Sequence, residues 1–129
     1  MILLDTDICI EILRKNKSVI KKRAQYDDTT AVSFMSIAEL YYGAEKSQNP
    51  GKNHHLINEF LLTIETVYAD NDILKKIGEL KSILSKENLL LPDADIFIAA
   101  TAYVKAEKLI TGNVKHFQRF PNLVIENWR

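Results

Sequence analysis

The chain has 129 residues, close to the commonest domain size, and we predict that residues 1–129 form a single domain. Hydrophobic residues make up 47% of it, which excludes an intrinsically disordered protein and suffices for a core without disulfides or a structural metal. The formal net charge is zero, from 17 basic and 17 acidic residues, so nucleic-acid binding by bulk positive charge is not indicated.

Strand and helix patterns alternate along the first half of the chain. Residues 2–4 are an apolar run that ends at Asp5, as a buried parallel strand would, and residues 5–7 offer N-cap oxygens for a helix. A second helix is predicted over 17–26 and a second strand over 29–33. Ser33 or Ser36 could cap the next helix, which the loop at 48–51 closes.

The alternation continues in the second half. Helical spacing of apolar residues predicts helices over 56–64 and 70–86, with a short strand near Val67 between them. Another helix begins at Asp93 or Asp95 and runs through residue 106, and one of these aspartates is expected to cap it. Residues 109–111 and 123–125 are the last predicted strands. This order indicates an α/β domain with a mostly parallel sheet.

Polar residues follow several of the predicted strands. Asp5 follows the first strand, Ser33 and then Glu39 follow the second, and Asn113 follows the strand at 109–111. In open α/β sheets, sites lie beyond the carboxyl ends of the strands. The helix that begins near residue 93 could point its N-terminus at the same edge. We therefore expect acidic and polar side chains to converge there from four separate places in the sequence.

Carboxylates that share one edge repel each other unless a cation lies between them. Oxygen ligands without nearby Cys or His suit Mg²⁺ or Mn²⁺ rather than zinc. Mg²⁺ takes only one or two carboxylates directly, so the remaining acids would bind through water or orient the attacking water. Such a site is typical of phosphodiester hydrolysis. The predicted metal-site residues are Asp5, Glu39, Asp93 and Asp95.

Each of these residues also has a purely structural interpretation. Asp7 could serve mainly as a helix N-cap, and both Asp93 and Asp95 could cap the helix that follows them. The segment Thr111-Gly112-Asn113 could be only a turn into a last short helix. Glu39 is harder to explain in this way, because its neighbours in the sequence are apolar and aromatic.

Taken together, four motifs and the C-terminal segment resemble those of PIN-domain ribonucleases. The motifs are Leu4-Asp5-Thr6-Asp7, Ser33-x-x-Ser36-x-x-Glu39-Leu40-x-x-Gly43, Asp95-x-x-Ile98-Ala99-Ala100-x-Ala102 and Leu109-Ile110-Thr111-x-Asn113-x-x-x-Phe117. Val124-Ile125-Glu126-Asn127-Trp128 is similar to the ending of the VapC toxin branch. The resemblance runs from Leu4 to Trp128, with the motifs in the family's order and spacing.

The resemblance implies a three-layer α/β/α fold and an endoribonuclease that depends on Mg²⁺ or Mn²⁺. It also implies a small VapB-like antitoxin that blocks the site, and a homodimer. Carried over by position, the catalytic residues are Asp5, Glu39, Asp95 and Asn113, with Asp7, Ser33, Ser36 and Thr111 in support. Asp95 is preferred to Asp93 because the family acid stands three residues before the isoleucine, here Ile98.

Two positions depart from the family's usual pattern. Residue 7, often asparagine, is Asp7 here, and residue 113, often aspartate, is Asn113. Residues that could contact RNA phosphates are Arg14, Lys15, Lys46 and Lys115, although a solvated surface position is the commoner role for any one of them. His116 could act as a general acid.

Two other functions fit part of the sequence. A strand followed by Asp5-Thr6-Asp7 is also how haloacid-dehalogenase phosphatases begin, but Glu39 and the motif from Ser33 to Gly43 would then go unexplained. A trapped phosphoaspartate on Asp5 would identify that chemistry. A catalytically weak PIN scaffold that only binds a protein partner is the other alternative, and metal-dependent RNA cleavage by the purified protein would exclude it.

The compartment is indicated by what the sequence lacks. The single Cys9 cannot form an internal disulfide, which is compatible with a reducing compartment. The N-terminus has neither the charged start nor the long apolar stretch of a signal peptide, and no run approaches the roughly 18 apolar residues of a membrane span. We therefore predict a soluble cytoplasmic protein.

Overall fold

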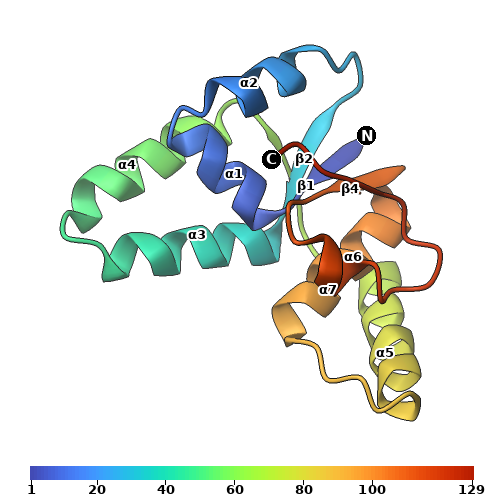
Figure 1. Ribbon diagram of the computed structural model, residues 1–129. Helices are drawn as coiled ribbons and strands as arrows, with labels where there is room; N and C mark the ends of the chain where they lie inside the picture. Colours follow the sequence, from blue (N-terminus) through green and yellow to red (C-terminus); the bar gives the residue numbers. More distant parts are fainter.

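Short apolar segments form one parallel sheet at the centre of the computed structural model, which describes residues 1–129 (Figure 1). Its strands are β1 (Ile2–Leu4), β2 (Thr30–Ser33), β3 (Glu65–Val67), β4 (Lys108–Ile110) and β5 (Ile125–Glu126). Their order is β3-β2-β1-β4-β5, and all four pairings are parallel. β1 is central and buried along its whole length, which explains why it reads as a continuous apolar run.

Seven helices cover the two faces of this sheet. They are α1 (Thr6–Leu13), α2 (Lys17–Ala24), α3 (Phe34–Lys46), α4 (Pro50–Leu61), α5 (Asn71–Lys86), α6 (Asp93–Lys105) and α7 (Val114–Phe117). Figure 1 shows α1 to α4 on one side of the strands, and α5 to α7 on the other. None of the helices combines the length and the apolar character needed to cross a bilayer.

Two hydrophobic cores result from this arrangement. Alternate residues of a strand point to opposite faces, so Ile2 and Leu4 of β1 contribute to the core under α1–α4, whereas Leu3 contributes to the core under α5 and α6. Each core contains at least twelve buried residues. The predicted three-layer α/β/α fold is therefore confirmed.

Several details of these elements differ from the expected ones. α4 begins at Pro50, inside the expected loop, because proline suits the first turn of a helix and the Asn49 side chain accepts a hydrogen bond from the Lys52 amide at 3.2 Å. Neither Asp93 nor Asp95 caps α6, because Pro92 occupies the cap position and makes no side-chain cap hydrogen bond. β5 lies later than 123–125, because its pairing with β4 starts at Ile125.

The segment after β5 is anchored by a buried aromatic side chain. Trp128 is 2% exposed, and its ring centroid lies 5.4 Å from that of Tyr26. Its indole N–H donates to the Glu126 carboxylate, which also accepts hydrogen bonds from the Tyr26 hydroxyl and the Lys108 ammonium. The Lys22 ammonium donates to the Trp128 carbonyl at 3.2 Å. These contacts fix the C-terminal segment against β4 and the region of α2.

We expect Trp128→Ala to lower the free energy of unfolding by about 3 to 5 kcal/mol, because it removes a large buried side chain and leaves a cavity. Urea denaturation followed by circular dichroism measures this change. Val124→Ala is the matched control in the same segment: its side chain is 55% exposed, and the expected loss is below about 0.5 kcal/mol. Equal effects of the two variants would contradict the anchoring role of Trp128.

Candidate active site

The carboxyl ends of β1 and β4 lie side by side, because these strands are direct neighbours in the sheet. The chain leaves β1 at Asp5 and leaves β4 at Thr111. β2 lies on one side of β1 and β4 on the other, so this point is where the strand order reverses and where α/β sheets open a crevice. The sheet topology thus brings the ends of β1 and β4 together at the edge where the site was expected.

Asp5 is the buried centre of this edge, with an exposure of 6%. Its Oδ1 accepts a hydrogen bond from the Thr6 amide at 2.8 Å, which caps α1, and its Oδ2 accepts one from the Thr111 hydroxyl at 2.7 Å. Desolvation nevertheless raises the pKa of Asp5 from its ordinary value of 3.8 to about 7, and the neighbouring Asp7 and Asp95 carboxylates contribute to the rise. Ionised Asp5 is thus a buried charge without a cationic partner of its own.

Glu39 is connected to Asp5 through the residue between the two aspartates. The Thr6 hydroxyl donates to Glu39 Oε1 at 2.7 Å and lies 2.9 Å from the Ser36 hydroxyl. Ser33 caps α3 by accepting from the Ser36 amide at 3.1 Å, so both serines position this chain of contacts. Thr6 was not among the predicted site residues, and its position between two aspartates is the one sequence feature that marks it.

Asp95 lies in the first turn of α6, with 16% of its side chain exposed. Its Oδ2 is 2.8 Å from Nδ1 of His116, a residue of α7. Asp95 is also one of the two acids that raise the pKa of Asp5, so the structure brings these two carboxylates into one electrostatic group. His116, which the sequence suggested as a general acid, holds the Asp95 side chain.

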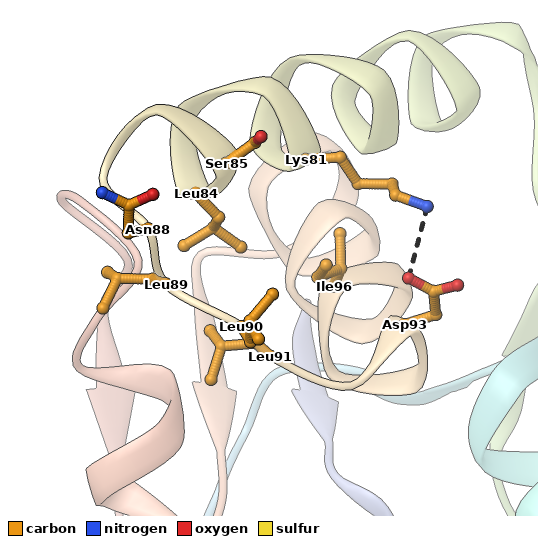
Figure 2. A pocket seen from close by; sticks show the side chains of 9 residues that line it. All are labelled: Lys81, Leu84, Ser85, Asn88, Leu89, Leu90, Leu91, Asp93 and Ile96. Carbon is orange, nitrogen blue, oxygen red and sulfur yellow. Dashed lines mark ion pairs between the residues drawn. The ribbon is translucent and has the colours of Figure 1, made fainter.

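Asp93 faces elsewhere, contrary to its predicted place among the metal-site residues. Side chains two residues apart on an α-helix are rotated by about 200° around its axis, so Asp93 and Asp95 project from nearly opposite sides of α6. The Asp93 carboxylate is 62% exposed and pairs with Lys81 of α5 at 3.3 Å. Figure 2 shows this pair beside a separate cavity of about 460 Å³, whose lining includes leucines such as Leu84 and Leu90.

Asp7 does not cap α1, because Asp5 takes that role. Asp7 Oδ2 accepts a hydrogen bond from the Gly112 amide at 2.9 Å and lies 3.4 Å from the Arg129 guanidinium. Its Oδ1 is buried and has no hydrogen-bond partner within the chain. A buried carboxylate oxygen in this position is available to a water molecule or a cation.

The segment after β4 completes the edge. Thr111 is buried, and its hydroxyl accepts from the Asn113 amide at 2.9 Å while donating to Asp5. Asn113 is half-buried and stands directly before α7, where its side chain makes no cap hydrogen bond. The amide side chain is thus not engaged by the start of that helix.

The four predicted phosphate contacts, Arg14, Lys15, Lys46 and Lys115, are all exposed. Arg14 shares a cavity of about 330 Å³ with Glu39, between α1, α3 and α4. The Lys46 ammonium lies 4.5 Å from the centre of the Tyr42 ring, as a cation–π contact. Of these four residues, only Arg14 lines the same cavity as an acidic residue of the site.

These side chains suit a hard cation that keeps several water ligands better than a cation coordinated by protein atoms alone. No group of three or more His, Cys, Asp or Glu side chains is close enough to hold a metal ion by protein ligands alone. Mg²⁺ and Mn²⁺ prefer oxygen, and Mg²⁺ needs only one or two carboxylates when water fills its other positions. The carboxylates of Asp5 and Asp95, which repel each other, and the unpaired Oδ1 of Asp7 provide such oxygens.

We expect Asp5→Asn to stabilise the metal-free protein. The pKa of Asp5 rises from 3.8 to about 7 on folding, so the folded state binds more protons between these values and wild-type stability falls as the pH rises through them. The full shift corresponds to about 4 kcal/mol, and we expect a gain of roughly 1 to 3 kcal/mol for the variant above pH 7. Near pH 4 the two proteins should be equally stable.

Urea denaturation in the presence of a chelator, at pH values from 4 to 8, measures this difference. Asp93→Asn is the control, because its carboxylate is exposed and paired with Lys81. A stability gain for Asp5→Asn that does not depend on pH would contradict the electrostatic cause.

Comparison with known proteins agrees with this architecture. The PIN domain family matches residues 2–123. Ribonuclease VapC2 of Rickettsia felis is 32% identical over 129 residues, covering 98% of this chain and 96% of the relative. The tRNA(fMet)-specific endonuclease VapC of Salmonella typhimurium is 28% identical over 127 residues, with the same coverage.

Among solved structures, that of VapBC2 from Rickettsia felis bound to a DNA fragment from their promoter superposes with a TM-score of 0.93. The aligned chain is 32% identical, and the alignment covers 100% of both chains. The family match, the identity and the superposition extend over nearly the entire sequence. The chain therefore belongs to the PIN-domain family and, within it, to the VapC ribonucleases of toxin–antitoxin systems.

Proposed function

We propose that this ribonuclease toxin is a Mg²⁺- or Mn²⁺-dependent endonuclease whose active site is the group formed by Asp5, Glu39 and Asp95. The observation that carries the metal proposal is Asp5 itself: a buried carboxyl beside Asp7 and Asp95, with its pKa raised to about 7. A cation at this position relieves the repulsion among the acids and stabilises the ionised form of Asp5. Such a cation can stabilise the charge that develops on the phosphate during phosphodiester hydrolysis.

The chain's own residues divide the work of the reaction. Asp5 and Asp95 would hold the ion, which would supply positive charge to the phosphate oxygens and make water more acidic. Glu39 is fixed by Thr6, so that its second carboxylate oxygen can accept a proton from the attacking water. His116 and Thr111 orient Asp95 and Asp5 through their hydrogen bonds. The Asn113 side chain, not used to cap α7, is free to contact the RNA.

The RNA substrate is expected to be recognised by its shape. The chain carries no net charge, so general attraction to polyanions does not select the substrate. RNA-specific contacts are made mainly to loops and unpaired bases. A relative from Salmonella typhimurium is named a tRNA(fMet)-specific endonuclease, which makes tRNA(fMet) the first substrate to test.

The partner is a VapB-like antitoxin that neutralises the toxin, since the solved relatives include VapBC complexes. We further propose that the protein works in the cytoplasm, where RNA substrates and a reducing environment coincide. The homodimer stays a prediction from the resemblance.

Cleavage of RNA tests the assignment of the acids. We expect Asp5→Ala and Asp95→Ala each to reduce cleavage of tRNA(fMet) by about 100-fold or more, the scale for losing a group that organises charge at the reacting centre. Asp93→Ala is the matched control on the same turn of α6, and it should retain activity because its carboxylate faces Lys81. Gel analysis of purified, antitoxin-free protein measures the rates. If wild type cuts no RNA with either ion, the enzyme assignment fails.

Metal binding has a readout that does not depend on activity. Mg²⁺ or Mn²⁺ at about 100 times its dissociation constant should stabilise wild type by about 2.7 kcal/mol in thermal or urea unfolding. Asp5→Ala should lose most of this gain, whereas Asp93→Ala should keep it. Equal stabilisation of wild type and Asp5→Ala would show that the ion binds elsewhere.

A further inference from the structure

Arg129 places a guanidinium group directly at the acidic edge. Its Nη1 lies 3.4 Å from Asp7 Oδ2, and its Nε lies 3.9 Å from Glu11 Oε1. Among the acids at this edge (Asp5, Asp7, Glu39 and Asp95), Asp7 alone forms an ion pair with an arginine or lysine. Arg129 is therefore the one permanently charged cation that contacts the group.

The backbone around Arg129 is held firmly although its side chain is half exposed. Trp128 is buried, and the Arg129 amide donates to the Asn127 side chain at 2.8 Å. From this fixed point the arginine side chain reaches across Gly112, the residue after Thr111. A Cβ atom at position 112 would stand 2.3 Å from Arg129 Cδ and 2.8 Å from Asp7 Oδ2. The Arg129 side chain therefore packs directly against the backbone of Gly112, and this packing requires a residue without a side chain at position 112.

The contacts of Arg129 leave most of its donors unused. The guanidinium has five N–H groups, and it makes a single hydrogen bond within the chain, at the long distance of 3.4 Å. Arg23 provides the contrast: its guanidinium donates to the Thr63 carbonyl at 2.6 Å and to the Thr63 hydroxyl at 3.3 Å, as a structural arginine does. The Arg129 side chain is 50% exposed, so a ligand in solvent can reach its guanidinium group.

We propose that Arg129 binds a backbone phosphate of the RNA next to the bond that is cut, with Asp7 and Gly112 as its positioning residues. A phosphate approaching this acidic edge is repelled by the carboxylates, and a guanidinium offers it two parallel hydrogen bonds. Asp7, the unusual acid of the pattern, holds the cation in place through one oxygen. This inference rests on the proposed function, because it assigns a contact to the same substrate.

Salt dependence of RNA binding separates a phosphate contact from a structural ion pair. The protein carries Asp5→Asn, which we expect to suppress cutting, and the ligand is labelled tRNA(fMet) at roughly 50 to 300 mM KCl. Loss of one phosphate contact should weaken binding roughly 5- to 10-fold and reduce the slope of log K against log salt by about 0.7 to 0.9. We expect this from Arg129→Gln, while Arg129→Lys should keep the slope because it keeps the charge.

Two further variants make the test specific. Lys75→Gln removes the same charge from an exposed position on α5 and should leave both affinity and slope unchanged. Gly112→Ala should reproduce the loss by displacing the Arg129 side chain, and adding Arg129→Gln to it should cause no further loss.

Each result decides the proposal. If Arg129→Gln lowers the unfolding free energy but leaves the salt slope as it was, the residue is a structural clamp and the proposal is overturned. If wild type cleaves tRNA(fMet) in that case, the proposed function stands on its own. If the unmodified chain neither cuts nor binds RNA, both fail together. If the losses of affinity from Gly112→Ala and Arg129→Gln add up in the double variant, Gly112 does not act by positioning Arg129, and that part of the proposal is contradicted.

Discussion

The hydrogen bond between Thr111 and Asp5 is the contact on which the acidic edge depends. It joins the end of β4 to the end of β1 across 106 residues of sequence, and it places a carboxyl in a position that is only 6% exposed. Burial makes the charge of that carboxyl costly, and two hydrogen bonds do not offset the cost, so its pKa stays high. The fold thus carries a local electrostatic strain that a bound cation would relieve. This is the usual relation between a stable scaffold and a destabilised site.

Each of the other acids is held by a partner from a different element. Thr6 links Glu39 of α3 to the start of α1, and His116 of α7 holds Asp95 of α6. Asp7 is held by the backbone of Gly112 after β4. These bonds use one oxygen of each carboxylate and fix its orientation. The remaining oxygens can therefore serve a cation or water without a rearrangement of the protein.

The layers and the edge of the site were predictable because they depend on short-range rules. Apolar runs, cap residues and the rule that sites lie beyond the carboxyl ends of parallel strands place Asp5, Glu39 and the segment after β4 at one edge from the sequence alone. The partners of these acids were not predictable, because they are set by side-chain direction and by contacts between distant segments. Asp93 and Asp95 are the same residue type in the same turn of α6. The helical rotation between them gives their carboxylates different partners, Lys81 for Asp93 and His116 for Asp95. Arg129 lies 122 residues from Asp7, and no local pattern marks it.

The zero net charge of the chain has a consistent explanation in this arrangement. A strongly basic surface would attract any polyanion, whereas a neutral one leaves substrate selection to a few directed contacts. The acidic edge repels RNA unless positive charge is present at the point of contact. In the proposed function, a cation among the carboxylates would provide that charge at the reacting centre, and Arg129 would provide it beside the centre. Asp7 adds one negative charge to the edge and also retains the guanidinium there, so the acid that departs from the family pattern and the arginine form one unit.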